Sequence, residues 1–373
     1  MYYNNRISFN SIIIKMGRSN GVKEYLKKNN FVNIKMLKDL ENIRLAIDVS
    51  GIIHRSKIHS NIKWWLQIIN LMNKFSNYKI KPVFVFDGKP PNEKLEIIEK
   101  RINKKDKIID KIIKKLNDTL INNEDTLLDN DNLIKINNLS KQLHVITIND
   151  IEICKQICIY FGIPFIHIKS LEADDIFSYL IERGFVDGVY SEDNDMFRRG
   201  CKTVYFGLDY NLNKLYEFIY NECLDRMNIT IEQFNNAYDS AGTDYGTDNL
   251  EYCKFKETIE LIRRYTTIEN VILNLDEINH GKTSRIIKVP RQFDYLKVRE
   301  IFDRELSCKI IKEINDSVYK FQYITDNVKI NLEEYSQRLF TEINNLYDID
   351  KKEAIKYIQQ SKDYYRNVYG IQI

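Results

Sequence analysis

Three short apolar runs, each rich in β-branched or aromatic residues and each leading into an acid, constrain the fold of this chain most. They are "IRLAIDVS" (43–50), "KPVFVFDG" (81–88) and "GVYSEDND" (188–195). Their length and composition are typical of buried strands. Helical patterns at 61–75 and 150–161 separate them. Strands that alternate with helices predict an α/β fold with a mostly parallel sheet and right-handed crossovers.

Chain length, net charge and the positions of the cysteines further limit the possible domain organisation, partners and cellular environment of this protein. A chain of 373 residues fits two domains, or one large domain with an insertion. The net charge of +3 does not identify a polyanion partner, so any basic surface must be local. Cys154 and Cys158 share a helix face, which predicts a core face rather than a metal site. The cysteines are expected to be reduced thiols of an intracellular protein, and no apolar run approaches the roughly 18 to 20 residues of a membrane span.

Acids follow all three predicted strands. Asp48 ends the first run, Asp87 ends the second, and Asp193 and Asp195 end the third. In open parallel sheets, ligands bind beyond the carboxyl ends of the strands, so these side chains are expected to meet at one edge. Asp193 and Asp195 are two residues apart, and in an extended segment they would point the same way.

Two further acidic sites fit the same edge. Glu172, Asp174 and Asp175 lie at the first turn of an expected helix, after the extended "GIPFIHI". Asp244 lies in the Gly-flanked turn "SAGTDYG". Taken singly, each of these acids is more often structural, either as a helix-capping residue or as an ordinary turn aspartate.

Taken together, the acids predict a metal site. Like charges at close range raise one another's pKa values, so a cluster of carboxylates needs cations. A donor set of oxygens without Cys or His suits Mg²⁺ or Mn²⁺. Two such ions, about 3.5 to 4 Å apart, can activate a water and stabilise the leaving oxygen of a phosphoryl centre.

Residues 92–142 differ from the rest of the chain. From Glu93 to Lys115 there are nine basic and five acidic residues, a local charge of +4. The charge pattern favours a solvated helical hairpin, because charge runs usually form solvated faces. The functional alternative is a mobile basic arm over a polyanion.

Six blocks of sequence resemble the flap endonucleases of the XPG-type structure-specific 5′ nuclease family. They are "LAIDVS", "KPVFVFDGKPP", "YFGIPFI", "LEADD", "SEDND" and "GTDY", in family order. The resemblance covers residues 16 to about 250 well and the C-terminal third weakly. It implies a PIN-like or resolvase-like fold: a twisted, mostly parallel sheet flanked by helices, with an inserted helical arch and a helical C-terminal region.

The resemblance also assigns roles to the acids. It implies two Mg²⁺ ions, for which Mn²⁺ can substitute. The first ion would be held or oriented by Asp48, Asp87, Glu172 and Asp174, and the second by Asp193, Asp195 and Asp244. Asp175 is a further acid beside the first group.

Basic and aromatic positions follow from the same resemblance. Lys94 and Arg101 match the basic residues at the base of the family's arch, and their spacing of seven puts both on one helix face, toward a single scissile phosphate. His54 stands where relatives carry a tyrosine that stacks on a base. The glycine hairpin that grips duplex phosphates and K⁺ is missing, so no K⁺ site is predicted. Duplex contacts are expected instead from Lys254, Lys256, Arg263 and Arg264.

The expected organisation has five parts. Met16 and Gly17 match the family's initiator methionine and following glycine, which predicts a translation start at Met16. The C-terminal "YYRNVYGIQI" does not spell the family's clamp-binding peptide, so no sliding-clamp partner is predicted. The parts are an N-terminal extension (1–15), the first part of the nuclease domain (16–91), the arch (92–142), the second part of the nuclease domain (143–250) and a helical C-terminal region (251–373).

The resulting hypothesis is a two-metal nuclease that cuts branched DNA near the junction of a 5′ flap and a duplex. The expected partner is flapped or branched DNA, and the protein is expected to be a monomer without a membrane contact. The expected location is intracellular, in the nucleus or another site of DNA replication, such as a viral replication compartment. The alternatives are a 5′–3′ exonuclease or junction-resolving relative, or a DNA-binding scaffold whose activity has decayed.

Overall fold

A computed structural model defines the fold. The structure describes residues 21–59, 64–94, 100, 107–108, 111, 114, 146–243, 245 and 248–327.

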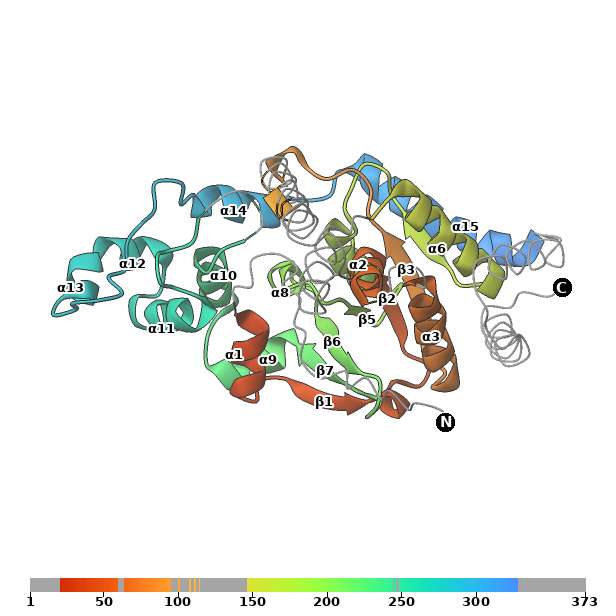
Figure 1. The fold of residues 1–373 in the computed structure, drawn as a ribbon, viewed down its shortest axis with the longest axis horizontal. Coiled ribbons are helices and arrows are strands. Elements are labelled where there is room, and N and C mark those ends of the chain that lie inside the picture. The colour runs from red at the N-terminus through yellow and green to blue at the C-terminus, as the bar shows by residue number, and fades with distance from the viewer. Residues whose placement is uncertain are drawn as a thin grey trace, which may run out of the picture.

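The centre of the molecule is a seven-stranded sheet with the strand order β1-β7-β6-β5-β2-β3-β4 (Figure 1). The strands from β6 to β4 in this order pair in parallel, whereas β1 and β7 add an antiparallel edge. The mostly parallel α/β sheet expected from the sequence is therefore confirmed. The strands are β1 (Asn33–Met36), β2 (Arg44–Asp48), β3 (Lys81–Phe86), β4 (Phe165–His167), β5 (Gly188–Tyr190), β6 (Thr203–Asp209) and β7 (Lys214–Ile219).

Successive residues of the central strands enter two separate cores. In β2, Leu45 and Ile47 belong to one hydrophobic cluster, and Ala46 between them belongs to the other. This alternation follows from the two-residue period of a strand, and it needs helices on both faces. The first core is closed by α2 (Val49–His59), α3 (Trp64–Asn77) and α6 (Ile148–Phe161).

The second core continues into a helical lobe. Phe206 and Phe218 of the sheet share a cluster with Phe234 and Phe255, so the lobe packs directly against the sheet. Figure 1 shows α11 to α14 of this lobe on the left, away from the sheet. The helices on this side are α1 (Val22–Lys28), α7 (Phe177–Glu182), α8 (Asp195–Arg198), α9 (Tyr220–Met227), α10 (Ile231–Ser240), α11 (Phe255–Tyr265), α12 (Ile268–Leu273), α13 (Leu275–Asn279), α14 (Tyr295–Phe302) and α15 (Cys308–Asn327).

Several local expectations hold, and one is wrong. The helices expected at 61–75 and 150–161 are α3 and α6, and Cys154 and Cys158 are both buried in the core. The third strand was predicted over 188–195, but β5 ends at Tyr190, and Asp195 is the first residue of α8. Asp193 and Asp195 therefore do not share one extended segment.

Some predictions fall on residues that the structure does not describe. These include the extension 1–15, the start at Met16, most of 92–142, Arg101, Asp244 and the chain after 327. Among the described residues, no helix is long and apolar enough to cross a membrane.

Candidate functional site

Asp48 anchors the candidate site at the junction of β2 and α2. Its carboxylate accepts hydrogen bonds from the Gly51 N–H (3.2 Å) and the Ser191 hydroxyl (2.8 Å). A Cβ atom at Gly51 would stand 2.9 Å from Asp48 Oδ2, so a larger residue here would displace the Asp48 carboxylate. Burial, and then the charge of Asp87, raises the pKa of Asp48 to about 7.

Asp87 lies just after β3, where two loops are locked together. The Gly88 N–H donates to the Leu171 carbonyl at 2.7 Å, and a Cβ at Gly88 would come within 2.2 Å of the Ile168 carbonyl oxygen. Asp87 Oδ1 in turn accepts the Ala173 N–H at 2.8 Å. Only glycine permits this approach, which brings the loop after β3 against the turn that carries the next acids.

Asp174 lies in a 3₁₀ turn, Ala173–Asp175, directly after Glu172. The side chain is buried. Burial, followed by the charge of Asp193, raises the pKa of Asp174 well above its usual value, and the charges of Asp48 and Asp87 add to this shift. Four carboxylates from separate parts of the chain therefore act on one another.

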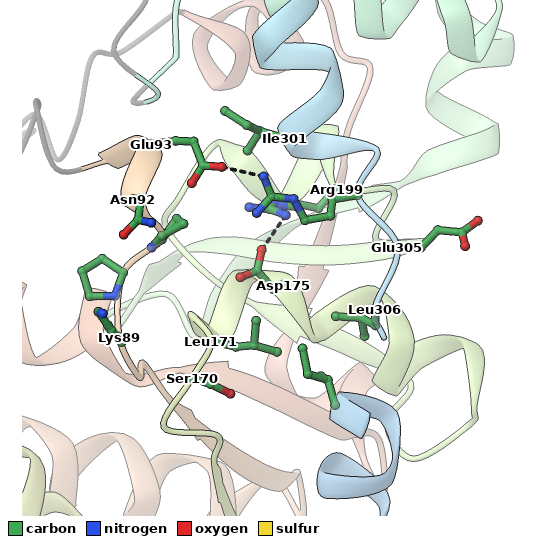
Figure 2. A pocket seen from close by; sticks show the side chains of 14 residues that line it. Lys89, Asn92, Glu93, Ser170, Leu171, Asp175, Arg199, Ile301, Glu305 and Leu306 are labelled. Atoms are coloured by element: carbon green, nitrogen blue, oxygen red, sulfur yellow. Dashed lines mark hydrogen bonds and ion pairs between the residues drawn. The ribbon is translucent and has the colours of Figure 1, made fainter. Parts of the chain in front are cut away.

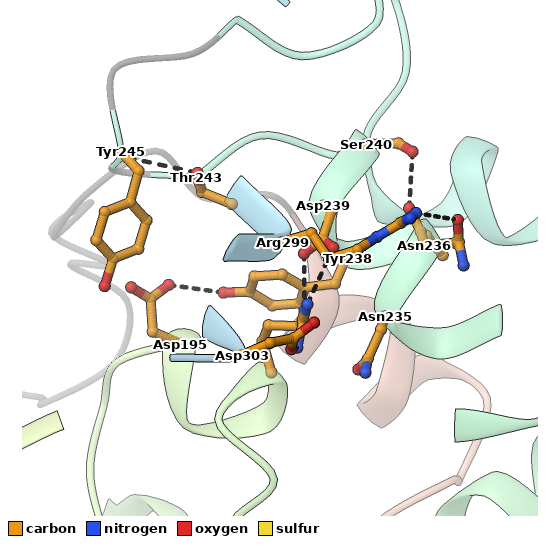
Figure 3. A network of polar contacts seen from close by, with 12 residues as sticks. Asp195, Asn235, Asn236, Tyr238, Asp239, Ser240, Thr243, Tyr245, Arg299 and Asp303 are labelled. Atoms are coloured by element: carbon orange, nitrogen blue, oxygen red, sulfur yellow. Dashed lines mark hydrogen bonds and ion pairs between the residues drawn. The ribbon is translucent and has the colours of Figure 1, made fainter. Parts of the chain in front are cut away.

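Asp193 and Asp195 are held by a local turn rather than by a strand. The Asp193 N–H donates to Ser191 Oγ (2.9 Å), and the Asp195 N–H donates to Asp193 Oδ1 (3.0 Å). Figure 3 shows the third contact, in which the Tyr238 hydroxyl donates to Asp195 Oδ1 at 2.8 Å. Because Tyr238 belongs to α10, the helical lobe helps to orient this acid.

Lys94 supplies a cation to the acidic group. Its ammonium forms a 2.6 Å ion pair with Glu172 and lies 5.0 Å from the centre of the Tyr245 ring. Burial opposes its charge, but Tyr245, Asp174 and Glu172 together raise the pKa of Lys94 above the usual lysine value. Lys94 is therefore a half-buried ammonium that is charged at neutral pH.

Arg199 is a second cation of this site, and the sequence analysis missed it. Its guanidinium forms a 2.6 Å ion pair with Asp175 and donates to the Tyr245 hydroxyl at 2.6 Å. The charges of Asp174 and Asp195 also act on it. The signal in the sequence was "FRRG", two arginines one turn after Asp195, which resembled an ordinary helix end.

A pocket of about 330 Å³ adjoins these groups (Figure 2). Its walls come from the loop after β3, the loop before the 3₁₀ turn and the link between α14 and α15. Two ion pairs cross it, Arg199 to Asp175 and Arg304 to Glu93, the latter at 2.6 Å. The C-terminal helices thus contact the base of the predicted arch.

Arg198 connects the helix α8, which begins at Asp195, to the helical lobe. Its guanidinium donates to Asp239 of α10 at 2.8 Å and to Asp303 after α14 at 2.8 Å. Burial raises the pKa of Asp239 to about 6, although the Arg198 charge opposes the shift. Figure 3 shows Asp239 and Asp303 beside Tyr238, the residue that holds Asp195.

Glu192 forms a separate ionic cluster next to the acids. Arg55 pairs with it at 2.9 Å, Lys23 at 3.6 Å, and the Gly207 N–H donates to it at 2.8 Å. Burial disfavours its ionisation, but Lys23 and Arg55 lower the pKa of Glu192 to about 2. The cluster ties α1 and α2 to the strand end that carries Asp193.

The remaining predicted DNA-binding residues are scattered. His54 is half-buried on α2, and Lys254 and Lys256 lie at the start of α11. Arg263 donates to the Tyr25 hydroxyl (3.2 Å) and the Met227 carbonyl (2.8 Å). Arg264 forms a 2.6 Å pair with Glu277. Both arginines therefore make contacts within the protein.

The donor chemistry of the site fits divalent cations. Six of the seven predicted ligands are described, all are carboxylates, and the raised pKa values of Asp48 and Asp174 show burial and mutual repulsion that a cation would relieve. Within the described part of the chain, however, no three acidic, histidine or cysteine residues form a ready-made metal cage. Lys94 is instead the counter-charge of Glu172.

The sheet order, the acids at its carboxyl edge and the helices on both faces define a PIN-like α/β protein. Two family models match it, the XPG N-terminal domain over residues 16–108 and the XPG I-region over residues 162–244. The chain is thus similar to both parts of the XPG family, over 176 of its 373 residues.

Curated relatives agree with this assignment. Flap endonuclease 1 of Glycine max is 29% identical over 239 residues, which are 63% of this chain and 57% of that protein. Flap endonuclease 1 of Enterocytozoon bieneusi is 28% identical over 294 residues, with 76% and 70% covered. The first relatives are thus matched over a little more than half of their length.

Solved structures show the same fold. The catalytic core of Rad2 in complex with a DNA substrate matches with a TM-score of 0.52 and 18% identity, over 79% of this chain and 85% of that chain. The junction-resolving enzyme GEN-1 with potassium matches with a TM-score of 0.51 and 16% identity, over 79% and 68%.

Proposed function

We propose that this protein is a divalent-metal-dependent, structure-specific 5′ nuclease that hydrolyses a DNA phosphodiester where a 5′ flap meets a duplex. The observation that carries the proposal is the shared electrostatic field of acids from four separate elements, with the half-buried Lys94 beside them. Relatives named as flap endonucleases support the reaction.

In this mechanism the acids divide into two groups. Asp48, Asp87, Glu172 and Asp174 would hold or orient the first ion, and Asp193, Asp195 and Asp244 would hold the second. Bound Mg²⁺ or Mn²⁺ ions would supply activation of the attacking water and charge stabilisation of the leaving oxygen. The Gly51 and Ser191 donors fix the Asp48 carboxylate, and Tyr238 fixes that of Asp195.

The basic groups act on the substrate. The Lys94 ammonium stabilises the negative charge that develops on the scissile phosphate, with Arg101 as its partner on the predicted arch. His54 stacks on a base next to the cut. Arg199 keeps Asp175 and Tyr245 together, so it positions the turn that carries Asp174.

A panel of end-labelled DNAs tests the proposal. We expect one cut near the junction of a 5′-flap substrate in Mg²⁺ or Mn²⁺ and none in EDTA. Nicked, gapped and four-way-junction DNAs of the same sequence separate a flap endonuclease from an exonuclease or a junction-resolving enzyme. Binding of every substrate without cleavage in either ion would contradict the proposal and indicate a decayed scaffold.

Replacement of Lys94 by alanine should lower kcat about 100-fold, because a lost charge-stabilising donor costs about 2.7 kcal/mol of transition-state stabilisation. KM should change much less. Steady-state cleavage of the flap substrate measures both values. The exposed Lys202→Ala variant is the matched control and should cleave like the wild type; equal rates for both variants would remove Lys94 from the mechanism.

A further inference from the structure

The link between α13 and α14 carries a row of four cations at a constant spacing. Lys282, Arg285, Lys288 and Arg291 recur every three residues in "KTSRIIKVPR", which we call the basic segment (residues 282–291). All four side chains are exposed. In the described part of the protein, none of them forms a salt bridge or a side-chain hydrogen bond.

The backbone of the basic segment is fixed in place. Ile287 is buried, and its N–H and carbonyl form a reciprocal pair of hydrogen bonds with the Asn279 side chain, at 2.9 and 2.8 Å. The Glu251 N–H donates to the Lys288 carbonyl at 3.0 Å. The cations therefore project from an anchored strip, and a partner would not have to order this backbone.

Other cations of the helical lobe are less available. Arg263 donates to Tyr25 and Met227, and Arg264 is paired with Glu277. Asp248 and Glu251 donate their N–H groups to the Gln292 and Lys288 carbonyls, and Asp294 lies three residues after Arg291. Four cations against these three acids leave a local excess of positive charge.

The spacing and place of the row fit an extended polyanion. Three residues span at most about 10 Å, so the row extends over at most about 30 Å. A DNA strand presents a phosphate every 3.4 Å or so of helix axis, so such a row can contact several phosphates. In Figure 1 the link between α13 and α14 lies in the helical lobe, away from the sheet and its acids.

A further cation lies between the basic segment and the candidate site. Lys297, six residues after Arg291 and near the start of α14, acts electrostatically on Glu93, the neighbour of Lys94. At the other end, Lys282 acts on Cys253, next to α11. The positive charge thus extends from the base of the predicted arch outward along the lobe.

We propose that the basic segment binds the sugar–phosphate backbone of duplex nucleic acid. It would contact the double-stranded part of the substrate at a distance from the cleavage point. This inference rests on the proposed function, which it deepens by naming the surface for the double-stranded part. Backbone contacts of this kind set register and affinity and are indifferent to base sequence.

The salt dependence of binding tests the inference. The variant K282Q/R285Q/K288Q/R291Q is titrated against a fluorescent 20-base-pair duplex in EDTA, by anisotropy, from 50 to 300 mM KCl. Each lost phosphate contact lowers the slope of log affinity against log salt by about 0.9, so we expect a decrease of about 3 to 4 and at least a tenfold weaker Kd at 100 mM salt.

Two further variants control for charge and structure. The variant K38Q/K202Q/K309Q/K312Q removes four exposed lysines elsewhere, with the same change in net charge, and should retain most of the slope. The variant K282R/K288R retains the charges and should bind like the wild type. Equal slopes for the segment variant and the lysine control would overturn the inference, whether both decrease or neither does.

Binding and cleavage are separate readouts here. The anisotropy slope is measured without a divalent ion, so it tests the basic segment even if the protein cuts no DNA. If flap cleavage occurs, the segment variant should show a raised KM with an unchanged kcat. An active enzyme with a wild-type salt slope would retain the proposed function and remove this surface.

Discussion

Replacement of Asp174 by asparagine should abolish most of the cleavage and at the same time stabilise the metal-free protein. The carboxylate is buried among Asp48, Asp87 and Asp193, and burial and like charge raise its pKa. The neutral amide removes that repulsion, so the melting temperature in EDTA should rise. Loss of one ligand should lower the single-turnover rate about 10³-fold, equivalent to about 4 kcal/mol.

The opposite signs of the two effects make this test specific. A residue that only supports the fold would lose activity and stability together. Mg²⁺ should raise the melting temperature of the wild type by binding to the native state, and should raise that of Asp174→Asn much less. Asp225→Asn, an exposed neutralisation on α9, should change neither quantity. Wild-type cleavage by Asp174→Asn would contradict the metal-site assignment.

Replacement of Glu192 by glutamine should destabilise the protein by about 2 kcal/mol at pH 7. The amide leaves Lys23 and Arg55 without their shared counter-charge. Removal of one partner from a fully buried ion pair typically costs about 3 to 5 kcal/mol, and the cost is lower here because the Arg55 side chain is 35% exposed. Urea denaturation followed by circular dichroism measures the difference. Glu41→Gln is the control, because its 2.5 Å pair with Lys79 is solvent-exposed and contributes about 1 kcal/mol at most.

The pH dependence of this difference has a defined sign. The folded-state pKa of Glu192, about 2, lies below the ordinary glutamate value of 4.5. Its contribution to stability is therefore complete above pH 4.5 and decreases as the pH falls from 4.5 toward 2. The gap between wild type and Glu192→Gln should narrow over that range, and a gap that is constant from pH 7 to pH 3 would contradict the assignment.

The sequence predicted the parallel centre of the sheet because buried strands have a strong local signature. The runs at 43–50 and 81–88 contain β2 and β3, and the acids after them lie at the expected edge. The edge strands β1 and β7 were not predicted, because their patterns alternate or are mixed with charge and their pairing depends on residues about 180 positions apart.

The acids of the site could be predicted from the sequence more readily than the charged residues that pair with them. Asp193 and Asp195 stand out because they follow an apolar run, whereas Arg199 and Glu192 carry no local signal of burial. Their roles depend on tertiary contacts, with Tyr245 and Asp175 for Arg199 and with Lys23 and Arg55 for Glu192. Duplex-binding cations were also assigned from motif position, although Arg263 and Arg264 have partners within the protein.

The two ion pairs of Arg198, with Asp239 and Asp303, affect when the nascent chain can complete its site during synthesis. Its partners Asp239 and Asp303 leave the ribosome 41 and 105 residues after it. A nascent chain that ends near residue 250 would carry the acids but lack the α14 end of this clamp. We therefore expect DNA cleavage to begin only after Asp303 has emerged, so that ribosome-tethered fragments stay inert beside nucleic acid.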